Sequence, residues 1–454
     1  MTSFDDSKPV RHVAVIGAGL SGLTAALRLQ QRGFETTIFE ATDAPGGRAS
    51  SVAKDGFIVD TGATALATSY DSYLPLIEEL GLSDEVIAQC SVMGVLRGDK
   101  VHLLDMKDPT AGLRTGLLSI GSKLKLVRVL IDAFKAKRAG MLKNSDMYRA
   151  APLDVESASE YTLRKLNKEV LDYLVSPIVR IMLMTDPYKA TKVELLSGIS
   201  NVFGSKIMAL KGGVGHLANV MASQLKPLYN SPVTAIRESS GGVEIDFKQN
   251  GLNETQAFDA AVVATTLPVA IDICDGAYAP LTKLASTLKY VPGLTVGVAM
   301  KRKPDSPAFA VLVPSVEDSD IALAFLDHNK SPDRAPEGKG LVDFHWETSA
   351  AARMANASDE QIIARTMEMT RRLFPEVAED DIEFAHVTRW SAALPFTSVG
   401  SYRAIGEFVR TMDHKGRVHF AGDYMSMAGQ NTAVEMGNRA ASRIDKIFNG
   451  TSQA

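Results

Sequence analysis

Hydrophobic and polar positions at the start of the chain follow the order strand, loop, helix, strand. Residues 12–16 form a short apolar run typical of a buried strand. Apolar positions every three or four residues give residues 23–32 one apolar face, as expected for a helix that ends at Gly33. A second strand is expected over residues 35–39. The pattern therefore predicts a β-α-β unit at the N-terminus.

Strand-like and helical runs continue along the rest of the chain. Residues 161–196 have helical patterning that Pro177 and Pro187 interrupt. A helix is expected over residues 359–374, with Ser358 as its N-cap. The remaining runs predict strands over residues 294–300, 308–313, 321–326, 341–346, 382–390 and 417–420, and a final helix over 433–444. All but the last of these strands suggest one mixed or antiparallel sheet.

The first loop reads Gly17-Ala18-Gly19-Leu20-Ser21-Gly22, and Glu40 ends the second strand. Gly17 permits a tight turn, Gly19 lets a diphosphate approach the backbone, and Gly22 lets the helix pack on the strand. The helix N-terminus offers N–H groups and a positive dipole end to phosphates. Glu40 is placed to accept hydrogen bonds from an adenosine ribose. A structural turn is the alternative, but the complete series favours a dinucleotide site, for FAD or NAD.

Composition narrows the class of protein. A chain of 454 residues suggests two or three domains, and a net charge of −4 argues against a nucleic-acid partner. The two cysteines, Cys90 and Cys274, show no metal or disulfide spacing, so no metal site is expected. No apolar run reaches the roughly 20 residues that span a bilayer. The sequence favours a cytoplasmic protein and leaves its oligomeric state open.

Two further segments carry a resemblance to a known family. Gly46-Gly47-Arg48 and Asp60-Thr61-Gly62 follow Glu40, and Ala421-Gly422-Asp423 precedes the last helix. Together with Lys211–Leu217, Ser231–Ile236 and Phe258–Thr265, these motifs resemble the flavin amine oxidase and protoporphyrinogen oxidase superfamily over nearly the whole chain.

The resemblance implies an α/β fold in which a discontinuous Rossmann-type FAD-binding domain holds an inserted α+β substrate domain. The expected ranges are 10–85, 205–275 and 405–454 for FAD, and 86–204 and 276–404 for substrate. Arg48 matches the diphosphate contact, and Asp423 matches the acid on the ribityl side. The FAD contacts implied are Gly17, Gly19, Leu20, Ser21, Gly22, Glu40, Gly47, Arg48, Thr61, Gly62, Ala63, Val233, Gly422, Asp423, Thr432 and Ala433. Ser401 stands near the position of the flavin-linked cysteine of some relatives, so the FAD is expected to be non-covalent.

The substrate side departs from the amine oxidases of this family. They hold the amine between two aromatic rings and keep a lysine near the flavin. Tyr402 matches the first ring, but the second falls in Ala428-Gly429-Gln430 and the lysine in Thr295–Val298, where neither residue type is present. Tyr402 and His345 are the candidate catalytic residues. The candidate cavity residues are Tyr70, Met182, Met184, Trp390, Phe396 and Gln430, for which core packing is the alternative.

These residues favour an FAD-dependent oxidase or dehydrogenase. It would move a hydride from a small cyclic or apolar substrate to flavin N5, by desaturation beside a carbonyl or in a ring, with oxygen or another electron acceptor. An amine oxidase with an atypical aromatic cage is one alternative. A flavoprotein with a structural or isomerase use of FAD is another.

The segment 107–149 is basic and amphipathic. Leu124, Val127, Leu130, Ile131 and Phe134 share one helical face, and lysines and arginines lie between them. We expect this face to pack on the substrate domain, because amphipathic surface helices are the norm in soluble proteins. Contact with an anionic membrane is the alternative.

Overall fold

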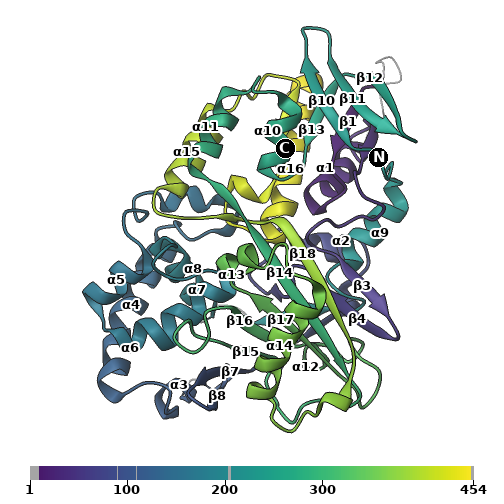
Figure 1. The fold of residues 1–454 in the computed structure, drawn as a ribbon. Helices are drawn as coiled ribbons and strands as arrows, with labels where there is room; N and C mark the ends of the chain where they lie inside the picture. Colours follow the sequence, from purple (N-terminus) through teal and green to yellow (C-terminus); the bar gives the residue numbers. More distant parts are fainter. Residues whose placement is uncertain (1–9, 89, 109, 203–205, 451–454) are drawn as a thin grey trace. The chain divides into compact units, whose positions relative to one another are not determined.

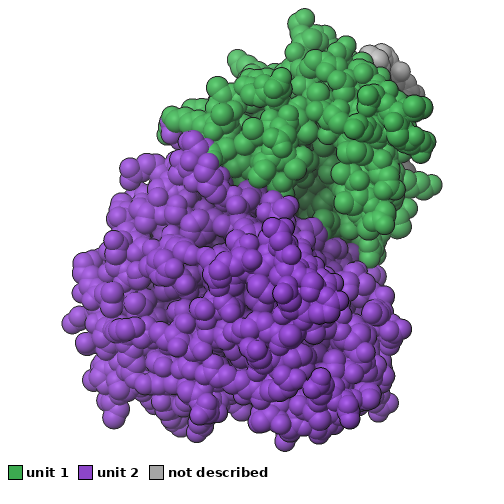
Figure 2. Space-filling view, in the orientation of Figure 1, with its two compact units in different colours: residues 1–47, 217–285, 408–454 green, residues 48–216, 286–407 purple. Residues whose placement is uncertain are grey.

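The computed structural model describes residues 10–88, 90–108, 110–202 and 206–450 (Figure 1). Contacts divide the chain into two compact units, which Figure 2 colours green and purple. Unit 1 consists of the chain up to residue 47, residues 217–285 and the chain from residue 408 onward. Unit 2 consists of residues 48–216 and 286–407.

Unit 1 is built on a four-stranded parallel sheet with the order β19-β13-β1-β2. Val13 of β1 pairs with Ala260 on one side and with Thr36 on the other, and every strand is buried at its C-terminal end. Helix α1 packs against α16. A second, antiparallel sheet has the order β10-β11-β12. The strands are β1 (His12–Ile16), β2 (Glu35–Phe39), β10 (Val233–Glu238), β11 (Val243–Gln249), β12 (Leu252–Phe258), β13 (Ala260–Val263) and β19 (Val418–Phe420); the helices include α1 (Leu20–Gln30), α9 (His216–Leu225), α10 (Leu267–Cys274), α11 (Ala279–Thr287) and α16 (Gln430–Asn449).

Unit 2 is built on a seven-stranded mixed sheet with the order β18-β14-β17-β16-β15-β7-β8. Figure 1 shows the long strands β14 and β18 side by side, and they pair antiparallel. One face carries the main core, which includes Val298, Phe344 and Trp346 and packs against α14. The strands of this sheet are β7 (Val92–Arg97), β8 (Lys100–Asp105), β14 (Lys289–Met300), β15 (Ala310–Leu312), β16 (Ile321–Leu326), β17 (Gly340–Trp346) and β18 (Ile382–Phe396).

Two small sheets and the remaining helices complete unit 2. The hairpin β3-β4 joins Ser51 to Asp60, and β5 and β6 flank β9. Their bounds are β3 (Ser51–Lys54), β4 (Phe57–Asp60), β5 (Leu66–Ala67), β6 (Val86–Ala88) and β9 (Ile207–Leu210). The helices are α2 (Tyr73–Glu79), α3 (Ala111–Arg114), α4 (Ile120–Arg138), α5 (Ala158–Lys165), α6 (Lys168–Val170), α7 (Ser176–Leu183), α8 (Lys192–Val202), α12 (Asp327–Lys330), α13 (Thr348–Arg353), α14 (Asp359–Leu373) and α15 (Ser401–Thr411).

The predicted α/β class with a Rossmann-type unit is confirmed. The five predicted sheet strands all occur, but the hairpin β7-β8 was missed. Pro177 does not interrupt a helix, because it lies in the first turn of α7, where no backbone N–H is needed. The units also differ from the predicted ranges: residues 48–85 and 205–216 group with unit 2. The physical reason is Asp60, whose carboxylate bonds to Lys330 and Arg334 of unit 2.

Candidate functional site

The C-terminal ends of four parallel strands bring the predicted dinucleotide residues of unit 1 to one edge of the sheet. Strand β1 runs into Gly17, β2 into Glu40, and β19 into Gly422 and Asp423. This is the edge at which open α/β sheets bind ligands. The sequence predicted these residues separately, and the parallel registers of β1, β2, β13 and β19 bring them together.

Close packing explains two of the glycines. A Cβ at Gly22 would lie 1.9 Å from the carbonyl oxygen of Gly17, and a Cβ at Gly17 would lie 2.8 Å from that of Ala264. Gly17 also has a φ of 103°. By contrast, a Cβ at Gly19 would meet only the oxygen of Gly46, at 3.9 Å. Gly19 therefore borders open space in front of helix α1, which begins at Leu20 with no side-chain cap.

Glu40 is held in place by its neighbours. One carboxylate oxygen accepts the N–H of Ala18 at 2.8 Å, and the other accepts the N–H of Thr42 at 2.9 Å. The second oxygen also accepts from the hydroxyl of Thr42 at 2.8 Å, so the oxygen bonded to Ala18 is the one that keeps acceptor capacity for a ribose hydroxyl. The segment leading to Val233 also passes here, because the N–H of Glu40 donates to Leu228. The chain that leads into β10 and Val233 therefore starts next to Glu40 in unit 1.

The C-terminal motif ends at a helix N-terminus. A Cβ at Gly422 would lie 2.4 Å from the ring of Tyr424, so the turn before Asp423 requires glycine. Helix α16 begins at Gln430, three residues before the predicted Ala433. Thr432 is buried in its first turn. A helix N-terminus at this place favours a partner that carries negative charge.

In unit 2, the predicted segment Thr61–Ala63 lies against Arg48. The N–H of Ala63 donates to the carbonyl of Arg48 at 3.0 Å, and a Cβ at Gly62 would lie 2.4 Å from that oxygen. Trp390 donates its indole N–H to the carbonyl of Thr61 at 2.6 Å. Trp390 therefore anchors this segment, a role that the sequence did not indicate.

Contacts within unit 2 orient Arg48. One guanidinium nitrogen donates to the carbonyl of Ala393 at 2.9 Å, and the guanidinium carbon lies 5.5 Å from the ring centre of Tyr290. Arginine presents five N–H donors in a planar fork, a geometry that matches a diphosphate.

A buried group of four charges holds the same segment, and the sequence reasoning missed it. Asp60, directly before Thr61, accepts from Arg334 at 2.9 Å and from the N–H of Val214 at 3.1 Å. Lys330 lies 3.2 Å from Asp60 and 2.7 Å from Asp327. All four charged side chains are fully buried. Burial raises the pKa of Asp327 to about 6, whereas Arg334 and Lys330 hold the pKa of Asp60 below its usual value against the opposing effect of its burial.

Tyr402, one of the two candidate catalytic residues, is enclosed. The side chain is 0% exposed, and its hydroxyl donates to Glu194. Thr397 donates to the same carboxylate at 2.6 Å, and the N–H of Tyr402 donates to Asp154 at 2.8 Å. Burial raises the pKa of both Glu194 and Tyr402. The geometry supports a structural role for Tyr402.

His345 lies on the central strand β17 and is paired with a carboxylate. Its Nε2 is 2.9 Å from Oδ2 of Asp343, and Asp343 is fully buried. The sequence reasoning named His345 but not Asp343. The alternation of β17 was a signal for it, because residues two apart on a strand share a face.

Most of the other candidate cavity residues pack against neighbouring side chains of their own unit. Met182 contacts the helical core of unit 2 and Met184 a second core, so packing, the alternative left open, fits both. Tyr70 lies edge-on to Tyr73 with ring centres 6.1 Å apart, and burial raises its pKa to about 12. Phe396 ends β18 opposite Lys289. Gln430 is buried in the first turn of α16.

The amphipathic face of α4 is exposed, contrary to the expectation that it packs on the substrate domain. Leu124 is 73% exposed and Phe134 is 64% exposed. The helix instead buries Val129, Ala133 and Ala136. The physical reason is that α4 has two apolar faces, and the one with smaller side chains lets the helix approach the core closely.

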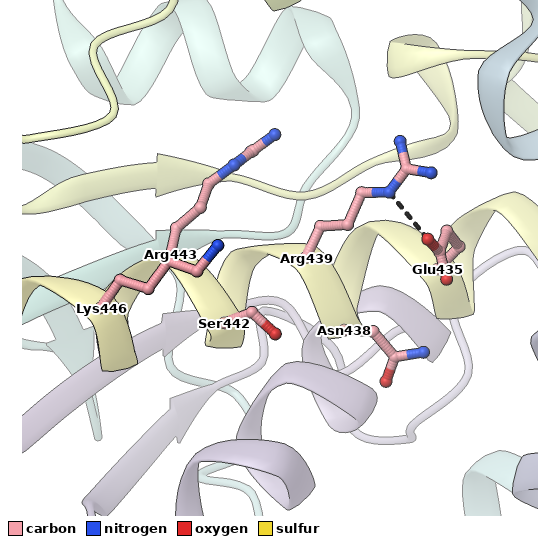
Figure 3. Close-up of a pocket in the computed structure, with 6 residues that line it drawn as sticks. All are labelled: Glu435, Asn438, Arg439, Ser442, Arg443 and Lys446. Atoms are coloured by element: carbon pink, nitrogen blue, oxygen red, sulfur yellow. Dashed lines mark hydrogen bonds and ion pairs between the residues drawn. The ribbon is translucent and has the colours of Figure 1, made fainter. Parts of the chain in front are cut away.

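A hollow of about 270 Å³ on α16 is separate from these residues (Figure 3). It is lined by Glu435, Asn438, Arg439, Ser442, Arg443 and Lys446. Figure 3 shows Arg439 bonded to Glu435 one turn away, at 2.7 Å. All six side chains come from one helix, and none is a predicted site residue. The part of the chain that the structure describes contains no cluster of metal-ligating side chains.

Comparison with known proteins identifies the family. The family model described as flavin containing amine oxidoreductase matches residues 20–445. The chain belongs to this family. Among its relatives, mitochondrial protoporphyrinogen oxidase of Nicotiana tabacum is 25% identical, over 99% of this chain and 97% of that protein. Coproporphyrinogen III oxidase of Bacillus subtilis (strain 168) is 23% identical, over 87% and 90%.

A solved structure has the same fold. Cyclohexylamine oxidase of Brevibacterium oxydans IH-35A aligns with a TM-score of 0.74 and 20% identity, over 97% of this chain and 100% of that one. The family makes this flavin amine oxidoreductase an FAD-dependent enzyme that acts on small molecules. The residues present fit FAD, because Gly19 leaves open space before α1 and Glu40 keeps acceptor capacity beside it.

Proposed function

We propose that this flavin amine oxidoreductase desaturates a small cyclic or apolar substrate, beside a carbonyl or in a ring, and is not an amine oxidase. The observation that carries the proposal is the enclosure of Tyr402 by Glu194 and Thr397. Without Tyr402, none of the three groups that the resemblance assigns to amine oxidases is in place. The similarity to protoporphyrinogen oxidase and coproporphyrinogen III oxidase also supports desaturation of a cyclic substrate.

The residues at the sheet edge would hold FAD. In unit 1, Gly17 to Gly22 and the N-terminus of α1 would receive the diphosphate, and Glu40 would bind the adenosine ribose. In unit 2, Arg48 is the candidate donor to a diphosphate. Asp423 and the first turn of α16 would face the flavin side. When bound, FAD supplies the acceptor for a hydride, while the protein supplies orientation and electrostatics. The FAD would be held without a covalent link.

A substrate panel tests this function. Purified holoenzyme is mixed anaerobically with cyclic ketones, porphyrinogens and primary amines, and loss of the oxidised flavin absorbance is followed. We expect reduction by members of the first two groups and reoxidation by oxygen or an artificial acceptor. Reduction by amines alone would restore the amine oxidase alternative, and product formed without net oxidation would indicate an isomerase.

We also propose that α4 contacts an anionic membrane surface. Its exposed apolar face lies among Lys125, Arg128, Lys135, Lys137 and Arg138, and its one acid, Asp132, is bonded to Tyr161 and Lys165. Such a helix lies in the headgroup region with its apolar side among acyl chains. No helix in the described residues is long and apolar enough to cross a bilayer.

A further inference from the structure

Asp343 and His345 form a hydrogen-bonded polar pair on β17 of the seven-stranded sheet. They point to the same face of β17, whereas Val342, Phe344 and Trp346 point to the main core on the other face. Nε2 of His345 lies 2.9 Å from Asp343. With its proton on Nε2, the imidazole would donate to the carboxylate and keep the lone pair on Nδ1. Carboxylates commonly fix a histidine tautomer in this way.

Two threonines extend this pair across neighbouring strands. Thr295 of β14 lies directly opposite His345, and Thr388 of β18 lies directly opposite Thr295. On the other side, Leu323 lies opposite His345, and the ring of Phe325 is edge-on to the imidazole with centres 5.3 Å apart. The result is a row of polar groups with an apolar wall beside it, as in many small-molecule sites.

The arrangement leaves buried polar atoms without partners. Oδ1 of Asp343 and Oγ1 of Thr388 are enclosed and accept or donate no hydrogen bond among the described residues. An unsatisfied buried polar atom costs about 1–3 kcal/mol, so such atoms are uncommon in a core that serves packing alone. Nδ1 of His345 also makes no hydrogen bond in the described part of the chain, but it is not among the enclosed atoms.

The row also coincides with a departure from the amine oxidases. Thr295 begins the segment in which the resemblance places their lysine near the flavin. Here that position pairs with His345 on β17 and with Thr388 on β18. The titratable side chain of this row, His345, therefore lies on the neighbouring strand β17 and not on β14.

We propose that His345 is the catalytic base that accepts the substrate proton during desaturation, with Asp343 as its positioning residue. This inference rests on the proposed function. The substrate would lose a hydride, with its two electrons, to the flavin, and a proton to Nδ1 of His345. The electron pair of the second broken bond then forms the new double bond. Oxygen or another acceptor would then take up the two electrons, and the imidazolium would return its proton to water.

Two substitutions and a control test the role. We would compare His345→Gln, Asp343→Asn and His386→Gln, since His386 lies on the same sheet opposite Gly297 and is half-buried. FAD content and circular dichroism establish that each variant folds. Loss of general-base catalysis lowers rates about 10²–10⁴-fold. We therefore expect His345→Gln to slow anaerobic flavin reduction by at least a hundredfold, with His386→Gln near the wild type.

A second measurement does not depend on activity. In protein labelled with ¹⁵N-histidine, we expect His345 to show the Nε2–H tautomer, and Asp343→Asn to lose that preference. Added imidazole should partly restore flavin reduction in His345→Gly, which a packing role would not produce. Flavin reduction by His345→Gln at the wild-type rate, or the Nδ1–H tautomer in wild type, would overturn the role of His345. Failure of every substrate to reduce the wild-type flavin would instead overturn the proposed function.

Discussion

Acid should destabilise unit 1 through His419. This residue lies on β19 of the parallel sheet, opposite Val262, and is 0% exposed. Burial lowers the pKa of its imidazole from about 6.5 to about 4. The folded unit therefore holds the neutral ring between these pH values, whereas the unfolded chain binds a proton.

Proton linkage gives the sign and the size of the effect of His419 on the pH dependence of stability. Because the unfolded state binds more protons at His419, the contribution of this residue to stability rises with pH between about pH 4 and pH 6.5. Above about pH 6.5 that contribution no longer changes. Lowering the pKa from about 6.5 to about 4 corresponds to about 3.5 kcal/mol of stability, at about 1.4 kcal/mol for each pH unit, and this stability is lost between pH 6.5 and pH 4. The strand leads into Gly422 and Asp423, so FAD should be released as unit 1 opens.

The assay is urea unfolding followed by the fluorescence of released flavin. Wild type and His419→Gln are compared at pH 7 and at pH 4.5, so that protonation of carboxylates contributes equally to both proteins. We expect the substitution to cost stability at pH 7 and to cost about 2–3 kcal/mol less at pH 4.5. His414→Gln, which removes an exposed histidine nearby, serves as the control.

An equal cost of His419→Gln at both pH values would refute the reasoning. If His419→Gln fails to bind FAD at pH 7, His419→Leu provides the same comparison with an apolar side chain. A change in His414→Gln as large as that in His419→Gln would show that the surface turn, and not the buried ring, controls the acid response.

Further predictions concern the cofactor and the surface. Arg48→Ala should weaken FAD binding tenfold to hundredfold, since a charged hydrogen bond contributes about 1.5–3 kcal/mol. Equilibrium dialysis measures the FAD affinity. The control Arg353→Ala, which removes a surface ion pair with Asp320, should leave that affinity unchanged. Gly22→Ala should destabilise unit 1 by at least about 1–3 kcal/mol, because its Cβ would overlap the oxygen of Gly17; thermal melting should show no such loss for Gly121→Ala, where the added Cβ has open space. The purified protein should be yellow and should release its colour on mild denaturation; flavin that stays attached would contradict a non-covalent link. Co-sedimentation with anionic vesicles should fall more than a hundredfold when Lys125, Lys135 and Lys137 become glutamate, since each lysine contributes about 1 kcal/mol. Lys123 is left intact there because it donates to the carbonyls of Leu113 and Thr115. The double variant Leu124→Ser/Phe134→Ser should also weaken vesicle binding. The control Leu252→Ser, in an exposed hairpin of unit 1, should not. Equal binding by all variants would exclude α4 as the membrane contact.

The sequence by itself determined the dinucleotide unit. Gly17, Gly22 and Glu40 act through local geometry, because each serves a turn, a helix contact or a strand end within thirty residues of the others. Their spacing therefore carries the information. Strand-like runs likewise predicted β14, β16 and β17 as strands of one sheet.

Only the tertiary structure decided which side chains are enclosed and which pairs of distant residues meet. Tyr402 is enclosed beside Glu194, more than two hundred residues away, which accepts a hydrogen bond from its hydroxyl. Asp60 and Lys330 are 270 positions apart, and no local pattern relates them. The sequence pattern of α4 pointed to the face with Leu124 and Phe134, and the close packing of the neighbouring core decides that the face with Val129 and Ala133 is the buried one. Burial and long-range pairing depend on the packing of the whole unit, whereas turns and strands depend on neighbours in the chain.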